Sequence, residues 1–349
     1  MKNQFFLFIA ACIVLLTACG QQGVVGLTEL NVMTHDSFAA SETVISEFEQ
    51  KYQVKINFIS SGDTGSALNQ AILTKSSPMA DVFYGVDNTF LSRALQEDIF
   101  ETYESPLLAN IPDEFKLDKE WRALPVDYGD VCINYDKAYF VEKSLTPPES
   151  LDDLLAPEYR GLLVVENPAT SSPGLAFLLA TIAYYGESGY LDYWQRLKDN
   201  GVVVVNDWET AYYSNFSASS GKGAQPLVVS YATSPAAEVV FADPPVSESP
   251  TASVVGSGTC FRQIEFVGIL KGAPQRELAE KFVDFMLSTQ FQEDIPLNMF
   301  VFPVNSQAQL PEVFLTQIQI PTQPASLPAD LITTNRENWI EAWRQLMLG

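Results

Sequence analysis

The sequence predicts an α/β protein of two lobes, because short apolar, β-branched runs alternate with amphipathic stretches in both halves of the chain. The 349 residues, of which 47% are hydrophobic, suffice for two domains with separate cores. In the first half we expect strands at 30–36, 54–60 and 80–87, followed by helices at 41–52, 64–74 and 88–97. In the second half we expect strands at 161–167, 202–207 and 226–234, followed by helices at 173–186, from 208 onward and at 235–241. This repetition is typical of parallel sheets.

Two extended segments with period-two alternation, 122–137 and 258–271, separate the two α/β units and are expected to cross between the lobes. Lobe 1 would then be discontinuous, comprising 28–125 and 262–325, with 126–261 as lobe 2. Residues 326–349 are expected to form a C-terminal helix that packs back on the lobes.

Two helices near the C-terminus have a clear apolar face. Helical spacing predicts one core-facing helix over 276–295. The final helix has a capping-box pattern from Thr334 to Glu337, which predicts its start. Trp339 and Trp343 are four residues apart in it, and packing is their expected role.

The first eighteen residues have the pattern of a signal peptide. Lys2 precedes an apolar stretch that is too short to span a bilayer, and "LTAC" (16–19) follows it. The small residues before Cys19 resemble a bacterial lipoprotein box, which implies cleavage before Cys19, acylation of that cysteine and a tether over 19–27. The protein would then be anchored on the outer face of the cytoplasmic membrane. The alternative is an ordinary secretory signal with an incidental cysteine.

Only Cys132 and Cys260 remain after the cysteines of the N-terminal segment. They fall on the two predicted crossover segments, and an oxidising exterior compartment allows them to pair. From the sequence alone, Cys132 and Cys260 could form a disulfide or remain two free thiols.

The charge balance excludes several classes of partner and chemistry. A formal net charge of −23 repels nucleic acid and anionic membrane surfaces and attracts a cationic ligand. His35 is the only histidine, so a multi-histidine metal site is excluded. The sequence has no legible nucleophile–base pair and no P-loop, so we expect neither an enzyme nor a bound cofactor.

Candidate ligand-binding residues lie where predicted strands end, because ligands of open α/β sheets gather at the carboxyl ends of the strands. Four segments qualify, and helix capping explains each of them as well: "THDSF" with His35 and Asp36, "GVDN" with Asp87, "NPATSSPG" with Ser171 and Ser172, and "SYATSP" with Tyr231 and Ser234.

The aromatic residues of "VVNDWETAYYSNF" (204–216) are a further candidate group. Trp208 and Tyr212, together with Tyr231, could pack in a core, bind a metal or stack on a flat cation. We expect Tyr213 to pack against other residues or to face solvent.

The segments "THDSFAA", "ADVFYGVDN", "LPVDYG", "NPATSSPGL", "WETAY", "VVSYATSPA", "LAEKFVDFMLSTQFQEDIP" and "FVFPVN" resemble the thiamine-binding substrate-binding proteins of bacterial ABC importers, which are related to ferric-binding receptors. The resemblance runs from about residue 28 to 345. It implies a two-lobed periplasmic-binding-protein fold of type 2, with the ligand cleft between lobes that crossover strands join.

The resemblance also implies roles for individual residues. Ring contacts to thiamine would come from Trp208, Tyr212, Tyr231 and Phe300, and Asp87 would meet the cation. Ser171 and Ser172 would face the phosphate end of a thiamine phosphate. This chain departs from the family at His35, where the family has a tyrosine, and at Phe300, where it has a tryptophan, which leaves affinity and ligand choice open.

The predicted function is therefore a lipid-anchored, monomeric receptor that captures thiamine or a thiamine phosphate and delivers it to an ABC permease. A ferric-iron or other small-solute receptor of the same fold is the alternative, since the ferric-binding relatives that the resemblance brings in use adjacent tyrosines, and Tyr212 and Tyr213 are such a pair.

Overall fold

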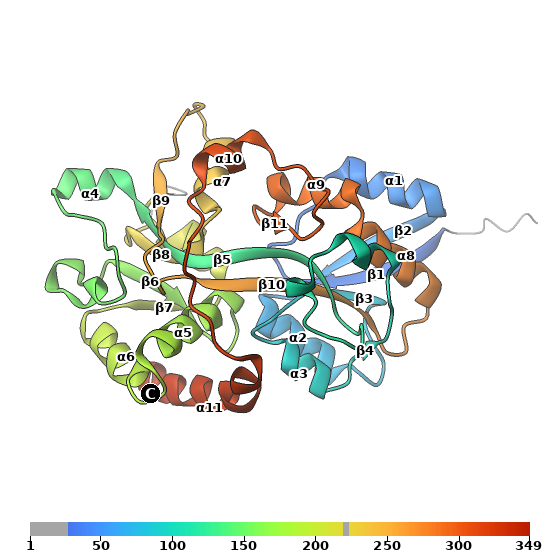
Figure 1. The fold of residues 1–349 in the computed structure, drawn as a ribbon, viewed down its shortest axis with the longest axis horizontal. Coiled ribbons are helices and arrows are strands. Elements are labelled where there is room, and N and C mark those ends of the chain that lie inside the picture. Colours follow the sequence, from blue (N-terminus) through green and yellow to red (C-terminus); the bar gives the residue numbers. More distant parts are fainter. Residues whose placement is uncertain (1–26, 219–222) are drawn as a thin grey trace, which may run out of the picture.

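The computed structural model describes residues 27–218 and 223–349, which form two lobes joined by two long strands (Figure 1). The strand order is β2-β1-β3-β10-β5-β8-β6-β7. One lobe contains the parallel strands β1 (Thr28–Thr34), β2 (Val54–Ser60) and β3 (Val82–Asp87), and the other contains β6 (Leu163–Glu166), β7 (Val203–Val205) and β8 (Leu227–Tyr231). The predicted two-lobed α/β architecture is confirmed. The predicted signal peptide, Cys19 and all but the last residue of the tether lie outside the described residues.

The central strands β5 (Leu124–Asp136) and β10 (Phe261–Leu270) run antiparallel across the middle of the molecule (Figure 1). Strand β10 is also antiparallel to β3, and β5 to β8. The sheet is therefore mixed, and the parallel prediction holds only for the outer strands. The strands β5 and β10 cross between the lobes and are not joined to their neighbours by βαβ units. Nothing therefore requires them to run parallel to those neighbours, and they pair antiparallel. Three short strands complete the sheet, namely β4 (Phe100–Glu101), β9 (Thr251–Val254) and β11 (Phe302–Pro303).

The helices of the first lobe begin at capping residues close to the predicted positions. Ser41 caps α1 (Glu42–Tyr52) and Asp63 caps α2 (Thr64–Leu73). The predicted single helix over 276–295 is instead two helices, because Ser288 adopts an extended conformation and its hydroxyl accepts from the N–H of Phe291. The remaining helices of this lobe are α3 (Leu91–Gln96), α8 (Arg276–Leu287) and α9 (Thr289–Asn298).

The second lobe carries a buried helix and a π-helical turn beside the sheet. Helix α5 (Ser172–Tyr185) is buried through most of its length. Residues Thr210–Asn215 form the π-helix where the sequence predicted a helix after Trp208. The other helices around this lobe are α4 (Lys137–Lys143), α6 (Tyr190–Asp199), α7 (Ser234–Val240) and α10 (Glu312–Gln317).

The C-terminal helix α11 (Ala329–Leu348) begins earlier than the capping-box pattern predicted. Thr334 lies inside the helix, where its hydroxyl donates to the carbonyl of Asp330 at 2.8 Å, so it is not a cap. Trp343 is fully buried and meets the Trp194 ring edge-on, which confirms its packing role. Because the Arg336 guanidinium lies over the Phe90 ring of the other lobe, α11 contacts both lobes.

A disulfide joins Cys132 of β5 to Cys260, immediately before β10. Both cysteines are fully buried. The pairing that the sequence left open is thus present, and it ties the two crossover strands together. Among residues 27–218 and 223–349, no helix combines the length and apolar character needed to cross a bilayer.

Candidate functional site

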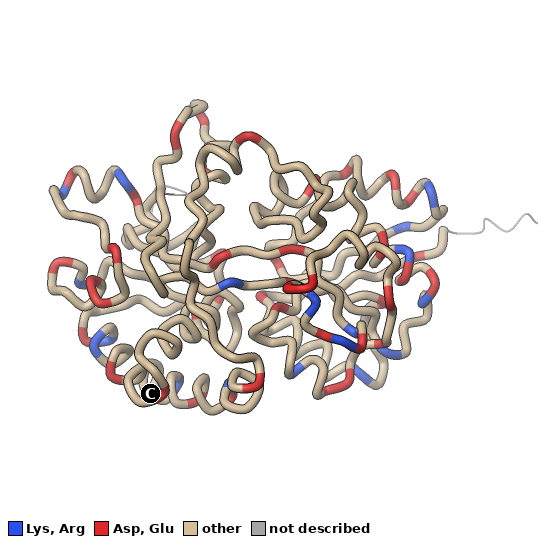
Figure 2. The backbone as a smooth tube through the Cα atoms, in the orientation of Figure 1, with Lys and Arg blue, Asp and Glu red and all other residues tan. Residues whose placement is uncertain are grey.

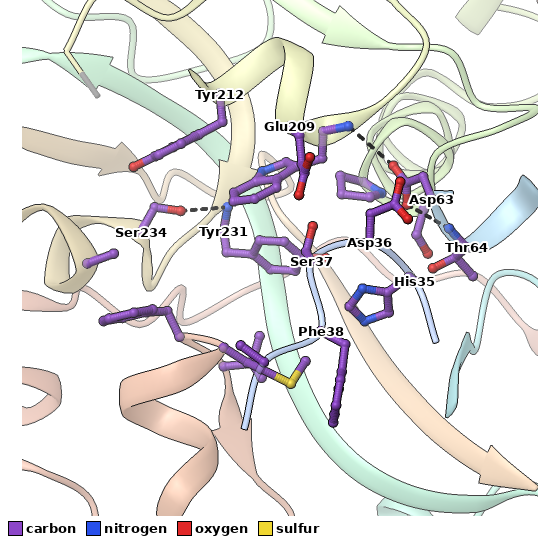
Figure 3. A pocket seen from close by; sticks show the side chains of 18 of the residues that line it. His35, Asp36, Ser37, Phe38, Asp63, Thr64, Glu209, Tyr212, Tyr231 and Ser234 are labelled. Carbon is purple, nitrogen blue, oxygen red and sulfur yellow. Dashed lines mark hydrogen bonds between the residues drawn. The ribbon is translucent and has the colours of Figure 1, made fainter. Parts of the chain in front are cut away.

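A cavity of about 290 Å³ lies between the lobes and collects most of the predicted site residues (Figure 3). Its lining side chains come from the ends of β1 and β8, from the middle of β10, from the starts of α2, α5 and α7, and from the π-helix and the segment after α9. The predicted residues that line it are His35, Asp36, Ser172, Trp208, Tyr212, Tyr231, Ser234 and Phe300. Strand ends and helix starts from both lobes therefore form one site.

One wall of the cavity is aromatic. The rings of Trp208 and Tyr212 are stacked, with centroids 5.0 Å apart and planes 18° apart. The Tyr231 ring meets Trp208 at 6.4 Å and 65°. Stacked faces with a third ring at an angle can hold a flat, positively charged ring system.

Hydrogen bonds fix these rings. The indole N–H of Trp208 donates to Ser230 Oγ at 2.9 Å, and Ser230 and Ser234 share a hydrogen bond of 2.8 Å. The Tyr212 hydroxyl donates to Glu238 Oε1 at 2.6 Å. The polar groups of Trp208 and Tyr212 thus have partners in the protein, and because the two rings stack on each other, at most one face of each is left for a ligand.

The opposite wall is acidic around His35. His35 lines the cavity, and its Nε2 lies 3.5 Å from Glu265 Oε1 and has no hydrogen-bond partner among the described residues. Burial opposes protonation of this imidazole, but Glu265, with smaller effects from Asp63 and Asp36, more than offsets burial and raises the pKa of His35. A proton on His35 is therefore held by the surrounding carboxylates.

Glu265 belongs to a buried carboxyl pair at the crossing of β5 and β10, strands whose acidic positions are visible in Figure 2. The Tyr84 hydroxyl is 2.6 Å from Asp127 Oδ2 and 2.9 Å from Glu265 Oε2. Burial and the neighbouring Glu265 raise the pKa of Asp127 well above its ordinary value. Burial also opposes ionisation of Glu265, but His35 and the hydrogen bonds more than offset it and lower the pKa of Glu265. Glu265 is thus the ionised member and faces the cavity.

Asp63 connects the lobes at the cleft. Its carboxylate caps α2 by accepting from Thr64 N–H at 2.8 Å, and it also accepts from Trp208 N–H of the other lobe at 3.3 Å (Figure 3). Nearby, Gly65 N–H donates to the Thr170 carbonyl at 3.1 Å. A Cβ at Gly65 would lie 2.9 Å from that carbonyl oxygen, so only glycine allows this approach. The lobes therefore meet beside the cavity.

Two residues predicted to contact the ligand, Asp87 and Ser171, are fully buried and are not among the residues that line the cavity. The Asp87 carboxylate accepts from Thr89 N–H at 2.6 Å and so holds the turn between β3 and α3. Gln263 Nε2 donates to Asp87 at 3.0 Å and to Ser172 at 3.1 Å, so Asp87 supports the cavity through Gln263 and does not reach a ligand directly.

Phe300 and Asp36 lie at the cavity as predicted, and each also has a structural role. Phe300 has a φ of 54°, and its ring packs 5.3 Å from Phe241. Asp36 accepts from Gly62 N–H at 2.8 Å and from the Ser60 hydroxyl, so it also holds the end of β2.

Comparison with known proteins places this geometry in a family. Residues 77–317 match the family described as bacterial extracellular solute-binding protein. The chain belongs to this family of extracellular solute-binding proteins. The thiamine-binding periplasmic proteins of Salmonella typhimurium and of Escherichia coli K12 are each 30% identical to it, over 90% of this chain and 92% of theirs. A solved structure of a periplasmic thiamin binding protein superposes with a TM-score of 0.80 at 28% identity, covering 91% of this chain and 96% of the other.

The tyrosine pair of this solute-binding protein does not form an evident metal site. Tyr212 and Tyr213 have ring planes 88° apart, and the Tyr212 hydroxyl is bound to Glu238. Tyr213 is 52% exposed at the cavity rim. Within the described part of the chain, no group of three or more His, Cys, Asp or Glu side chains is arranged to hold a metal ion.

Three carboxylates of the cavity were missed by the sequence analysis, namely Asp63, Glu209 and Glu265. Asp63 follows β2 and begins a helix, so the rule that selected Asp36 also applies to it. Glu265 is a charged residue inside an otherwise apolar strand, which is an unusual place for a carboxylate. Glu209 has no such signal beyond its position next to Trp208.

Proposed function

We propose that this solute-binding protein captures thiamine in the cavity between its lobes and delivers it to an ABC permease. The observation that carries the proposal is the pairing of an aromatic wall, Trp208 and Tyr212, with an ionised carboxylate at Glu265. Thiamine has a permanently cationic thiazolium ring, which suits charge pairing with a carboxylate, and a flat pyrimidine ring, which suits stacking on an aromatic wall. The thiamine-binding relatives support the same ligand.

The position of the cavity supports a transport role. It lies between two lobes, and contacts such as Asp63 to Trp208 form only where the lobes meet. Capture of a solute between lobes lets a partner distinguish loaded from empty protein by shape, because ligand contacts to both lobes favour the closed arrangement.

Anchoring and assembly complete the proposal. We infer that acylated Cys19 holds the protein, as a monomer, on the outer face of the cytoplasmic membrane near its permease. The mass of protein extracted from membranes distinguishes a processed, acylated Cys19 from an ordinary cleaved signal.

Calorimetric titration of ligand-free protein with thiamine tests the proposed function. We expect saturable heat with one site per chain, together with quenching of tryptophan fluorescence because a ring would stack on Trp208. A ferric receptor would instead give a visible phenolate absorption band on addition of ferric iron. Absence of both heat and quenching with thiamine would reject the proposal.

Thiamine affinity is expected to fall as the pH is lowered through the pKa of His35. This pKa is raised above 6.5, and a protonated imidazole repels the incoming cation. The dissociation constant should therefore increase as the pH falls, by up to about tenfold per pH unit, and binding should release protons. Titrations at several pH values, in buffers of different ionisation enthalpy, measure both quantities.

The matched variant for this pH dependence is His35→Gln. It removes the titrating group and leaves Glu265, Asp36, Asp63 and the Tyr84 hydroxyl facing the same space. Burial raises the pKa of Asp87 to about 7. Asp87 still titrates in the variant, so any pH dependence of thiamine affinity that remains there gives the contribution of groups other than His35. An unchanged pH dependence in His35→Gln would show that another group is responsible.

A further inference from the structure

The cavity is lined by several carboxylates and by few positively charged groups that could pair with an anion. Its carboxylates are Asp36, Asp63, Glu209 and Glu265. Among the described residues that line it, none is lysine or arginine. The only basic side chain there is His35, and its Nε2 lies 3.5 Å from Glu265. A monocation fits this environment, whereas a phosphate would be placed among like charges.

The helix start that could hold a phosphate is already occupied. At the beginning of α5, Ser171 is fully buried, and Pro173 has no N–H to offer. The Ser172 hydroxyl accepts from Gln263 Nε2 at 3.1 Å. The Thr170 carbonyl is bound to Gly65 across the lobe contact, which covers this end of the helix.

A protein carboxylate takes the position of an anion at this contact. Asp63 lines the cavity beside Ser172 and accepts N–H groups from Thr64 and Trp208. Burial raises the pKa of Asp63, and the hydroxyl of Ser171 and the Thr64 N–H act in the opposite direction. A phosphate that approached Ser171 would have to displace Asp63 and separate the lobes.

We propose that this cavity selects thiamine itself, or a similar organic monocation, against its phosphate esters. The inference rests on the proposed function and narrows it. A phosphate adds about 1.5 to 2 negative charges at pH 7, and no basic side chain of the described lining compensates for them. The order of affinity is therefore thiamine, then the monophosphate, then the diphosphate.

Calorimetric titration of the whole protein with the three compounds, under one buffer and salt condition, tests this order. We expect the monophosphate to bind at least about tenfold more weakly than thiamine, and the diphosphate more weakly still. Tight thiamine binding with equal or tighter ester binding would overturn the selectivity and leave the proposed function standing. If no compound binds, both proposals are overturned together.

Variants in which a carboxylate is replaced by its uncharged amide identify the residues that cause the selectivity. Asp63→Asn retains an oxygen that can cap α2 and removes the charge at the lobe contact, so it should reduce the thiamine-to-monophosphate ratio by about tenfold. Glu209→Gln is the second variant, because this side chain makes no capping hydrogen bond. Asp192→Asn, on the exposed start of α6, is the control and should leave the ratio unchanged. Ratios unchanged in both cavity variants would contradict the assignment to these carboxylates.

Discussion

Replacing Trp208 with alanine is expected to weaken thiamine binding by about 30-fold or more, which corresponds to about 2 kcal/mol. The change removes the ring that stacks on Tyr212 at 5.0 Å and meets Tyr231 at an angle. It also leaves Ser230 without the indole N–H that it accepts. Loss of the cation–π contact weakens binding, and so does the water that enters the cavity in place of the indole ring. Calorimetric titration measures the change.

The conservative variant Trp208→Phe separates stacking from general packing. It retains an aromatic face but loses the indole N–H, so its affinity should lie between those of the wild type and the alanine variant. Tyr213→Ala is the control, because Tyr213 is 52% exposed and meets Trp208 only edge-on. Thiamine binding by Trp208→Ala within twofold of wild type, with normal thermal unfolding, would remove the stacked wall from the proposed site.

Much of the fold could be predicted because its outer strands are short segments rich in apolar and β-branched residues, and helix-capping residues follow several of them. The segment 54–60 alternates apolar with polar residues and forms β2 over the predicted residues. Ser41 precedes an amphipathic pattern and caps α1. Such signals are local, so they can be found without knowing which segments meet in space.

The differences arise where tertiary contacts override a local pattern. Thr334 and Glu337 have capping-box spacing, but the chain is already helical from Ala329, and the Thr334 hydroxyl donates to the Asp330 carbonyl within that helix. Ser288 interrupts an amphipathic pattern that continues on both sides of it. The direction of β10 depends on its pairing with β3 and β5, which no local signal reveals.

The candidate site shows the same division. Strand-end and helix-start signals selected Asp36, Trp208 and Ser234 from the sequence, and all three line the cavity in the structure. The same signals selected Asp87, which is fully buried and holds the turn before α3. Glu265 lies far along the sequence from His35, and only the crossing of β10 brings their side chains to 3.5 Å. The charge pairing at the site is therefore a product of topology.

Removing the disulfide with the double change Cys132→Ala and Cys260→Ala is expected to lower the free energy of unfolding by about 2–5 kcal/mol. The two cysteines are 128 residues apart, so the bridge closes a long loop in the unfolded chain and restricts its conformations. Alanine is the appropriate replacement, because both positions are fully buried and a serine hydroxyl would require a new partner. Denaturant unfolding of the oxidised wild type and the double variant measures the difference.

Thiamine affinity should change much less than stability in the double variant. The strands on each side of the bridge are already paired, since Val131 faces Phe261 and Cys132 faces Ser230 in the ladder. Ser230 in turn positions Trp208 through the indole N–H, so the native site retains its support once the protein is folded. An affinity loss larger than the loss produced by Trp208→Ala, in a variant that unfolds normally, would mean that the bridge holds the crossover strands in register around the site. Stability lowered by less than about 1 kcal/mol would instead mean that the unfolded chain is already restricted over this loop.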